Sequence, residues 1–344
     1  MLILAIESSC DETSAAVVKN GRDILSNVVS SQIEIHSPYG GVVPELASRA
    51  HLESIIPVVD KSLKEAEITL KEIDAVAVTT GPGLIGSLLV GIETAKVISY
   101  TQNIPLITVH HIAGHLYTPF LKFTDKKTLT KGKLTYPYLG LAVSGGHTSL
   151  YIVESPTEYK LIGETLDDAA GEAYDKVAKL LNLSYPGGPI IDKIAQNTAQ
   201  TSITFPRPLA KQNNCSFSFS GLKTAVLNYT KKVGLDKLKE DENHLNEVCK
   251  AFQEAVVDIL IIKIKFALKK YNLNNLAIVG GVAANGGLRE AVKKQFDNIN
   301  YFIPAPVLCT DNAAMIGGIA YQLQKSNGFT NPDYSLNADT SFKL

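Results

Sequence analysis

The chain has few cysteines and no long apolar run, and each shortage excludes a class of protein. Its 344 residues include four Cys, at positions 10, 215, 249 and 309, and no two of them form a Cys-x-x-Cys pair. Scattered thiols argue against a disulfide framework and against a Cys-rich zinc site, and they fit a reducing cytosol. No apolar run approaches the roughly 20 residues that a membrane-spanning helix needs. We therefore expect a cytoplasmic protein without a membrane span.

The sequence also lacks a basic leader and an excess of charge of one sign. Residues 1–6 are apolar with no basic region before them, and Glu7 follows at once, which predicts a strand and not a signal peptide. The 33 Lys and Arg nearly balance the 34 Asp and Glu. This balance argues against a generally basic nucleic-acid binder but leaves room for a local basic patch. With 45% hydrophobic and 19% charged residues, the composition is that of a globular protein long enough for two domains.

Histidine is scarce as well, yet three of the seven His lie within residues 110–115. This stretch follows an apolar run, residues 104–109, that predicts a buried strand, and it opens a helix expected to reach Phe120. Residues i and i+4 share one face of a helix, so His111 and His115 should point the same way, just beyond a strand end, where open α/β sheets place their ligands. Two imidazoles at this spacing suit zinc or iron, although they are an incomplete ligand set. The alternative is that both are ordinary polar residues at a helix start.

A candidate third ligand lies near the C-terminus. The last predicted strand, residues 301–303, is followed by residues 309–315, which open the final predicted helix. Asp311 thus follows a strand end, as His111 does. In isolation its simpler role is to cap that helix, which Thr310 could equally do.

The order of predicted elements in the first half recurs in the second. The first half has predicted strands at 2–6, 14–18 and 22–30, with a polar turn at 7–13. About 137 residues later, the second half has predicted strands at 138–143, 149–153 and 159–164, with a turn at 144–148. Such a turn can present backbone N–H groups to a phosphate, and two copies facing one another would make a clamp. A single copy would be a plain hairpin.

Further glycine-rich turns and long helices complete the pattern. Residues 280–287 form a glycine-dense loop between a buried strand and a helix, where backbone can approach a nucleotide closely and Asn285 can add an amide. Asp167 and Asp168 suit the N-terminus of a helix expected to reach Leu181. Long helices are predicted at 45–65, 86–100 and 248–271, and residues 200–245 predict an inserted helical subdomain. Lysines are clustered at 126–133 and at 263–270, and the first cluster lies within a polar segment predicted as a linker and domain boundary. Either cluster could face tRNA. For the first cluster, the alternative is a solvated loop.

Seven motifs, in order along essentially the whole chain, resemble those of the TsaD family, the bacterial tRNA adenosine threonylcarbamoyltransferases. They are Glu7–Thr13, His111–His115, Ser144–Thr148, Asp167–Lys176, Tyr185–Pro189, Gly280–Asn285 and Cys309–Asn312. The resemblance implies a two-lobed α/β fold of the actin, hexokinase and Hsp70 class with duplicated βββαβα lobes. We expect an N-terminal lobe over residues 1–133 and a C-terminal lobe over 134–344, with the helical insertion around 200–245 and a final helix that returns to the cleft between the lobes.

The resemblance also implies a reaction and its residues. Threonylcarbamoyl would pass from threonylcarbamoyl-AMP to the adenosine 3′ of the anticodon in tRNAs that read codons beginning with A. Carried over by motif, one divalent metal, iron(II) with zinc as the alternative, would be held by His111, His115 and Asp311. The adenylate-binding residues would be Ala142, Val143, Ser144, Gly145, Gly146, Asp175, Gly188, Asp192 and Asn285. A Tyr ligand of distant archaeal relatives would fall at Ala142, which cannot ligate, so the metal should keep more open or water-filled positions.

The expected partners are tRNA, a shorter TsaB-like paralogue, a TsaE-like ATPase and the enzyme that makes the adenylate. Asp11 or Glu12 could assist proton removal. Cys10 is more simply a buried structural residue, because direct transfer needs no covalent intermediate. Three rival functions remain: a small-molecule kinase of the same fold, which leaves the His pair unexplained; a metalloprotease, which should have Glu where Ile112 follows His111; and a non-enzymatic nucleotide-binding scaffold.

Overall fold

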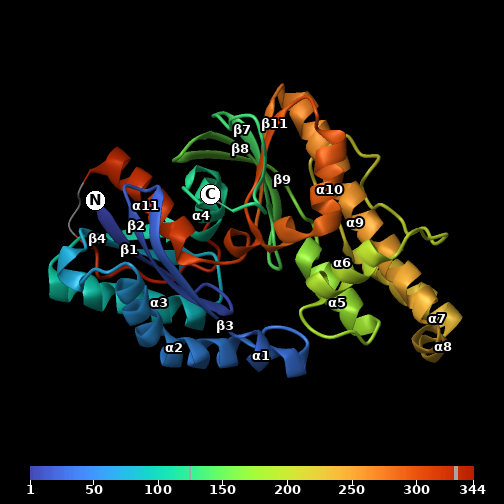
Figure 1. Cartoon of the computed structure of the whole chain (residues 1–344), viewed down its shortest axis with the longest axis horizontal. Coiled ribbons are helices and arrows are strands. Elements are labelled where there is room, and N and C mark those ends of the chain that lie inside the picture. The colour runs from blue at the N-terminus through green and yellow to red at the C-terminus, as the bar shows by residue number, and fades with distance from the viewer. Residues whose placement is uncertain (124, 329–331) are drawn as a thin grey trace. The chain divides into compact units, whose positions relative to one another are not determined.

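Two mixed β-sheets organise the chain, one in each of two units (Figure 1). The computed structural model describes residues 1–123, 125–328 and 332–344. The first unit comprises Met1–Lys126, Glu154–Tyr159 and Thr310–Leu344, and the second comprises Lys127–Val153 and Lys160–Cys309. The last helix in the chain therefore groups with the N-terminal strands.

The first sheet has the strand order β3-β2-β1-β4-β5. Its strands are β1 (Leu2–Glu7), β2 (Glu12–Lys19), β3 (Asp23–Ser31), β4 (Ala75–Gly81) and β5 (Leu106–His110). Alternate residues of β1 face opposite sides: Ile3 and Ala5 pack with the last helix, α11 (Ala313–Asn327), whereas Leu4 and Ile6 pack with α2 (Pro44–Glu65) and α3 (Ile85–Gln102). Burial on both faces explains why β1 and β4 are almost continuously apolar.

The second sheet repeats this topology and adds an edge strand, in the order β6-β11-β10-β7-β8-β9. Its strands are β6 (Leu129–Lys131), β7 (Tyr138–Val143), β8 (Thr148–Ser155), β9 (Glu158–Glu164), β10 (Asn275–Val279) and β11 (Asn300–Ile303). β7 pairs antiparallel with β8 and parallel with β10, as β1 does with β2 and β4. The predicted duplication is confirmed.

The two units differ most in the helices between their third and fourth strands. In the first unit this segment contains α2 and the short helix α1 (Ile33–His36). In the second it contains α5 (Ala170–Leu180), α6 (Gly187–Asn197), α7 (Ser220–Val233), α8 (Leu235–Glu240) and α9 (Glu242–Tyr271). After β10 follows α10 (Gly286–Gln295). Of residues 200–245, expected to form a helical insertion, 220–245 contain α7, α8 and the start of α9, whereas 200–219 lie outside any helix.

The segment expected to be a linker and domain boundary also contains β6, which pairs antiparallel with β11. One local prediction was wrong. Helix α5 begins at Ala170, so Asp167 and Asp168 do not lie in its first turn. Asp167 instead accepts hydrogen bonds from the backbone N–H groups of Phe219 and Ser220 at the start of α7, at 2.8 and 3.1 Å. A carboxylate does stabilise a helix N-terminus here, but the helix lies about 50 residues further along the chain.

Among the described residues, no helix combines the length and apolar character that crossing a bilayer would require.

Gly280 provides a test of how the second sheet is joined to its glycine-rich loop. Its φ of 94° lies in the left-handed region, and a Cβ would lie 2.5 Å from the carbonyl oxygen of Val143. Gly280→Ala should therefore destabilise the protein by about 1–3 kcal/mol through backbone strain alone, and by more through the clash. Gly281→Ala is the matched control, because no atom lies within 4 Å of a Cβ built there. Equal thermal unfolding midpoints for the two variants would contradict this account.

Candidate metal centre

The strand β5 leads directly into helix α4 (His111–Tyr117), with no loop residue between them. His110 caps the helix, because its Nδ1 accepts a hydrogen bond from the N–H of Ile112 at 3.1 Å. All seven residues of α4 are buried, and the rings of His111 and His115 lie one turn apart with centroids 4.8 Å from each other. The predicted shared face of the two imidazoles is therefore present.

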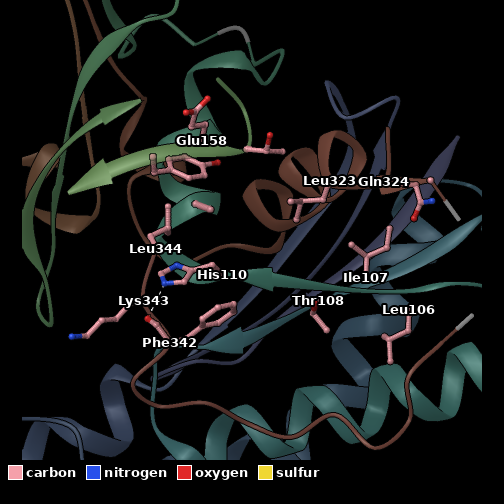
Figure 2. Close-up of a pocket in the computed structure, with 14 residues that line it drawn as sticks. Leu106, Ile107, Thr108, His110, Glu158, Leu323, Gln324, Phe342, Lys343 and Leu344 are labelled. Atoms are coloured by element: carbon pink, nitrogen blue, oxygen red, sulfur yellow. Dashed lines mark hydrogen bonds between the residues drawn. The ribbon is translucent and has the colours of Figure 1, made fainter. Parts of the chain in front are cut away.

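The C-terminal segment contacts the same strand end. The backbone carbonyl of Phe342 lies 2.9 Å from His110 Nε2. Beside this contact lies a cavity of about 540 Å³, lined by residues of β5, α11 and the C-terminal segment (Figure 2). None of the predicted site residues lines this cavity.

Asp311 precedes α11 but does not cap it. The cap is Asn312, whose side chain accepts from the N–H of Met315 at 3.2 Å. The first two N–H groups of the helix, those of Ala313 and Ala314, donate to Ser14 Oγ and Asn27 Oδ1, at 2.9 and 3.2 Å. The capping alternative for Asp311 and Thr310 was wrong, because the side chains of other residues already satisfy this helix start.

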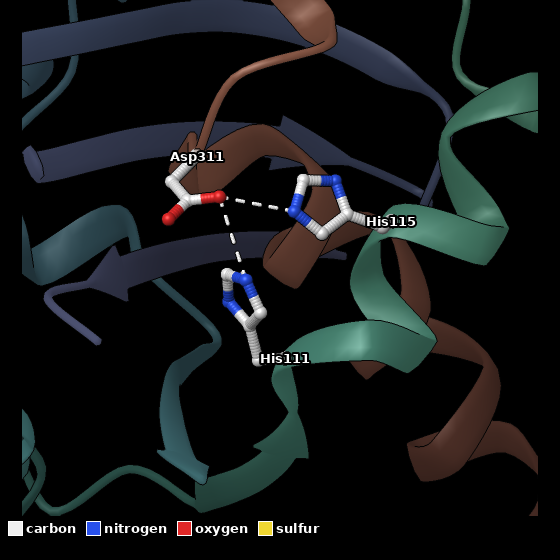
Figure 3. Close-up of side chains that lie close together, drawn as sticks. All are labelled: His111, His115 and Asp311. Atoms are coloured by element: carbon white, nitrogen blue, oxygen red, sulfur yellow. Dashed lines mark hydrogen bonds and ion pairs between the residues drawn. The ribbon is translucent and has the colours of Figure 1, made fainter. Parts of the chain in front are cut away.

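The carboxylate of Asp311 turns to the two histidines instead (Figure 3). Its Oδ1 lies 3.0 Å from His115 Nε2 and 3.4 Å from His111 Nε2. Among the described residues, these three side chains are the one group of His, Cys, Asp or Glu found close enough to hold a metal ion. The structure thus brings together the three side chains predicted as metal ligands.

Glu7, which sequence analysis did not select, lies on the other side of His111. Its side chain is fully buried. Oε2 lies 3.0 Å from His111 Nδ1 and 2.5 Å from Thr79 Oγ1, and Oε1 accepts from the N–H of Ser9 at 2.6 Å. An ionised carboxylate only accepts, so His111 carries a proton on Nδ1, and Nε2 is the ring nitrogen that faces Asp311. The sequence signals were a charged residue at the end of an apolar strand and its place at the start of the Glu7–Thr13 motif.

The electrostatics of this cluster favour a positive charge. Burial would lower the pKa of His111, but Asp311 and Glu7 outweigh it and raise that pKa well above its usual value. Burial would likewise raise the pKa of Asp311, yet His111 and His115 hold it well below its usual range. The cluster therefore attracts a cation to the point where Asp311 meets the two imidazoles.

The separations also suit a metal. With bonds of about 2.1 Å, neighbouring ligand atoms lie about 3.0 Å apart at a right angle and about 3.4 Å apart at the tetrahedral angle, which are the two distances that Asp311 Oδ1 makes. Two imidazoles and one carboxylate form a donor set known for both zinc and non-haem iron(II), with positions left open for water or substrate. The residues present fit a divalent metal.

The two acids considered for proton transfer lie at the start of β2 in the same unit. Burial above all, followed by the charges of Asp11 and Asp311, raises the pKa of Glu12 well above its usual value. Burial also raises the pKa of the Cys10 thiol well above its usual value. A protonated thiol is a poor nucleophile, which agrees with the structural role expected for Cys10.

In the second unit, the residues predicted to bind adenylate lie at strand ends and helix starts. Ala142 and Val143 end the buried strand β7. In the turn that follows, Ser144 Oγ accepts from the N–H of His147 at 3.2 Å. No atom lies within 4 Å of a Cβ built at Gly145 or Gly146. The backbone of this turn is therefore open to a ligand.

The remaining predicted residues hold backbone at the starts of two helices. Asp175 accepts from the N–H of Gly187 at 2.8 Å, next to Gly188, and Asp192 accepts from Gly286 at 2.8 Å. Asn285 caps α10 by accepting from the N–H of Leu288 at 2.9 Å. Asp192 and Asn285 thus meet at one helix start.

A buried glutamine on α9 joins these two side chains. Gln253 donates from Nε2 to Asp192 Oδ1, and its Oε1 accepts from Asn285 Nδ2, both at 2.9 Å. No sequence pattern singled it out, since one polar residue within a long amphipathic helix is unremarkable. The adenylate-binding role of the whole set remains a prediction.

Comparison with known proteins identifies the family. The sequence model of TsaD, tRNA N6-adenosine threonylcarbamoyltransferase, matches residues 23–318. A protein of that name from Geotalea daltonii is 51% identical over 318 residues, which cover 92% of this chain and 90% of the relative. Another from Syntrophotalea carbinolica is 48% identical over 346 residues, which cover 100% and 97%.

The chain belongs to the TsaD family. This confirms the resemblance, and it makes the chain a transferase of the kind that modifies tRNA.

Solved structures support the fold of this TsaD-family chain. Full-length HypF in a phosphate- and nucleotide-bound form gives a TM-score of 0.60 at 13% identity, covering 96% of this chain and 56% of that chain. Component A of (R)-2-hydroxyglutaryl-CoA dehydratase from Acidaminococcus fermentans gives 0.55 at 13% identity, covering 94% and 99%. These proteins have the actin-like fold, so the predicted fold class is confirmed.

His111→Ala tests the metal cluster. Loss of one of three ligands should remove most bound metal, measured by elemental analysis of protein reconstituted with zinc(II), while circular dichroism stays that of the unchanged protein. The matched control is His244→Ala, which removes a histidine that contacts Tyr229 outside the cluster. Full metal occupancy in the His111→Ala protein would refute the ligand assignment.

Proposed function

We propose that this chain transfers threonylcarbamoyl from threonylcarbamoyl-AMP to N6 of the adenosine 3′ of the anticodon, in tRNAs that read codons beginning with A. The observation that carries the proposal is the buried meeting of His111, His115 and Asp311 in a chain of the TsaD family. The carbonyl of the donor's mixed anhydride must be made electrophilic, and the weakly nucleophilic adenine amine must be oriented. A divalent metal held by this cluster would serve both needs.

We infer that these three residues hold one divalent metal, iron(II) with zinc as the alternative. When bound, it would supply a Lewis acid for the donor carbonyl and a template for the two substrates. His111 and Asp311 are both oriented in the absence of metal. Glu7 holds His111, and Asp311 is free to face the histidines because Asn312 caps α11 in its place. Ala142 offers no ligand atom, so we expect the remaining positions to stay open to water or substrate.

The bond changes in the transfer define what the acids must do. N6 of adenine bonds to the carbonyl carbon, the bond from that carbon to the phosphate oxygen breaks, AMP leaves, and N6 gives up one proton. Glu12 is our first candidate to accept this proton, because the pKa shift caused by its burial makes its carboxylate a stronger base. Asp11 is the second candidate. Orientation of the weak nucleophile should supply much of the rate.

We assign adenylate binding to the loops of the second unit. The open backbone at Gly145 and Gly146 supports close approach of phosphate, and Gly188 is nearly as open, since a Cβ built there would meet only Tyr174 Cβ, 3.9 Å away. Asp192 and Asn285 support the site by fixing the start of α10, because their side chains accept from the N–H groups of Gly286 and Leu288.

Burial excludes one of the clustered lysines as a tRNA contact. Lys263 is fully buried and donates to the carbonyls of Gln212 and Asn214, so it cannot contact phosphate. Lys133 is exposed, and Lys131 lies 3.6 Å from Asp297 with its side chain partly exposed. Lys265, Lys269 and Lys270 of α9 are exposed, so burial excludes Lys263 alone. We propose residues 126–133 as the tRNA contact.

A reconstituted reaction tests the function. Purified protein, threonine, bicarbonate, ATP and tRNA are combined with a TsaB-like paralogue, a TsaE-like ATPase and the synthase of the adenylate, and each component is omitted in turn. We expect modified adenosine, detected by mass spectrometry of tRNA digests, only when this chain and the adenylate or its synthase are present. ATP consumption with sugars or carboxylates, without tRNA, would instead indicate the rival kinase.

Gly145 tests the nucleotide assignment. Because space is open around this residue, Gly145→Val should fold, but its branched side chain would lie where phosphate approaches. We expect adenylate affinity to fall at least tenfold, equivalent to about 1.4 kcal/mol, and less in Gly145→Ala. Calorimetric titration with a non-hydrolysable adenylate analogue measures both variants, and unchanged affinity in the valine variant would make the turn purely structural.

Lys131 and Lys133 test the tRNA surface. Phosphate contacts release counterions, so binding by this nearly neutral chain should be weak and steeply salt-dependent, and tighter in the complex with its partners. Charge reversal of both lysines should lower tRNA affinity and leave adenylate affinity unchanged. Lys269→Glu on α9 is the control with comparable exposure. Normal tRNA binding by the double variant would move the surface elsewhere, and lost adenylate binding would place the segment in the active site.

A further inference from the structure

A second buried carboxylate, Glu7, accompanies the three candidate ligands without being one of them. It ends β1, whereas His111 begins α4, 104 residues later. Its Oε2 lies 3.0 Å from His111 Nδ1, the ring nitrogen opposite the one that faces Asp311. Neither the transfer chemistry nor the ligand set explains why the fold buries a further negative charge here.

We propose that Glu7 is a positioning residue that fixes the tautomer and orientation of His111 for metal binding and, with Asp311, matches the site to a divalent cation. The inference rests on the metal centre assigned under the proposed function. It concerns how the site is prepared, and not which atoms touch the metal.

The hydrogen-bond pattern carries the first step. A metal binds an imidazole nitrogen through its lone pair, so His111 can bind through Nε2 only when Nδ1 holds the proton. Glu7 accepts at Nδ1 and thereby selects this tautomer. The hydroxyl of Ser9 also lies near Nδ1, at 3.2 Å, but a hydroxyl can donate or accept and cannot select a tautomer.

The surroundings of Glu7 hold its carboxylate in one orientation. Thr79 Oγ1 donates to Oε2 at 2.5 Å and the N–H of Ser9 donates to Oε1 at 2.6 Å. The same Oε2 therefore receives donors from β4 and from α4. A side chain fixed at both oxygens cannot rotate away from His111, so the ring is held in place before a metal binds.

The charge balance carries the second step. With both histidines neutral, Glu7 and Asp311 give the buried cluster two negative charges. A divalent cation neutralises it, whereas a monovalent cation leaves one negative charge in a buried site. Burial makes any residual charge costly. Glu7 thus contributes to the preference for a divalent ion without contacting it.

Glu7→Gln separates positioning from structural support, because it preserves shape and removes charge. The N–H of Ser9 requires an acceptor, so the glutamine carbonyl should turn to Ser9 and its amide should donate to His111 Nδ1. His111 would then carry its proton on Nε2, the nitrogen needed for the metal. We expect zinc(II) affinity, measured with a competing chelator, to fall 10- to 100-fold.

Two further readouts do not depend on metal. Nitrogen chemical shifts of labelled His111, recorded in the metal-free protein at a pH high enough to make the ring neutral, should report the Nδ1–H tautomer in the unchanged protein and the Nε2–H tautomer in Glu7→Gln. The metal-free unfolding midpoint should fall, because the substitution breaks the buried ion pair of Glu7 with His111, so this readout is interpreted together with the affinity and not alone. The matched control, Glu45→Gln, makes the same substitution at an exposed carboxylate of α2 outside the cluster, and should bind zinc(II) as the unchanged protein does.

The outcomes distinguish this inference from the metal centre itself. Equal zinc(II) affinity and the same tautomer in the Glu7→Gln and unchanged proteins would overturn the positioning role while leaving the metal centre in place. A lower metal-free midpoint with unchanged affinity would assign Glu7 a purely structural role. If the unchanged protein binds no zinc(II) or iron(II), the metal centre fails, and the tautomer measurement still decides whether Glu7 controls His111.

Discussion

The contact of Asp311 with His111 and His115 joins the last helix of the first unit to the junction of β5 and α4, and the local structure on both sides is arranged around it. On one side, the start of α11 is satisfied by Asn312, Ser14 and Asn27, so Asp311 need not cap it. On the other side, His110 caps α4 and leaves both later histidines to face Asp311. Independent anchoring of the two helix starts means that the fold, and not a metal, brings the three side chains together.

The same contact creates an electrostatic requirement. Asp311 and Glu7 lie on opposite sides of His111, and their charges outweigh the burial that would otherwise keep this ring neutral, so its pKa is raised. In the metal-free protein a proton on His111 balances part of this negative charge, and a divalent ion would balance more of it. A chain that only needed a packed core here would use apolar residues, which pack without this cost. We therefore interpret the cluster as a binding site, because packing alone would not require buried charged residues here.

Sequence reasoning located the parts of this site that depend on local pattern. The i, i+4 spacing placed His111 and His115 on one face, and the strand-then-polar-turn pattern revealed the repeated sheet. The prediction that Asp311 follows a strand end was wrong, because β11 ends at Ile303 in the second sheet and Asp311 belongs to the first unit. Sequence reasoning did not find Glu7 or Gln253, because each acts through a partner far along the chain, and neither has a neighbour whose spacing signals the contact. It misplaced the start of α5 for a related reason: Asp167 stabilises a helix N-terminus, but that of α7. Pairing across long sequence separations is a property of the packed fold, and family resemblance supplied part of what spacing could not.

The account depends most on the link between bound metal and transfer. The most direct measurement titrates the metal-free protein with iron(II) in the complete reaction and determines bound metal and modified adenosine in the same samples. We predict that modified adenosine rises in proportion to occupancy and reaches its maximum at one metal per chain. Full transfer by protein kept metal-free with a strong chelator would contradict the account.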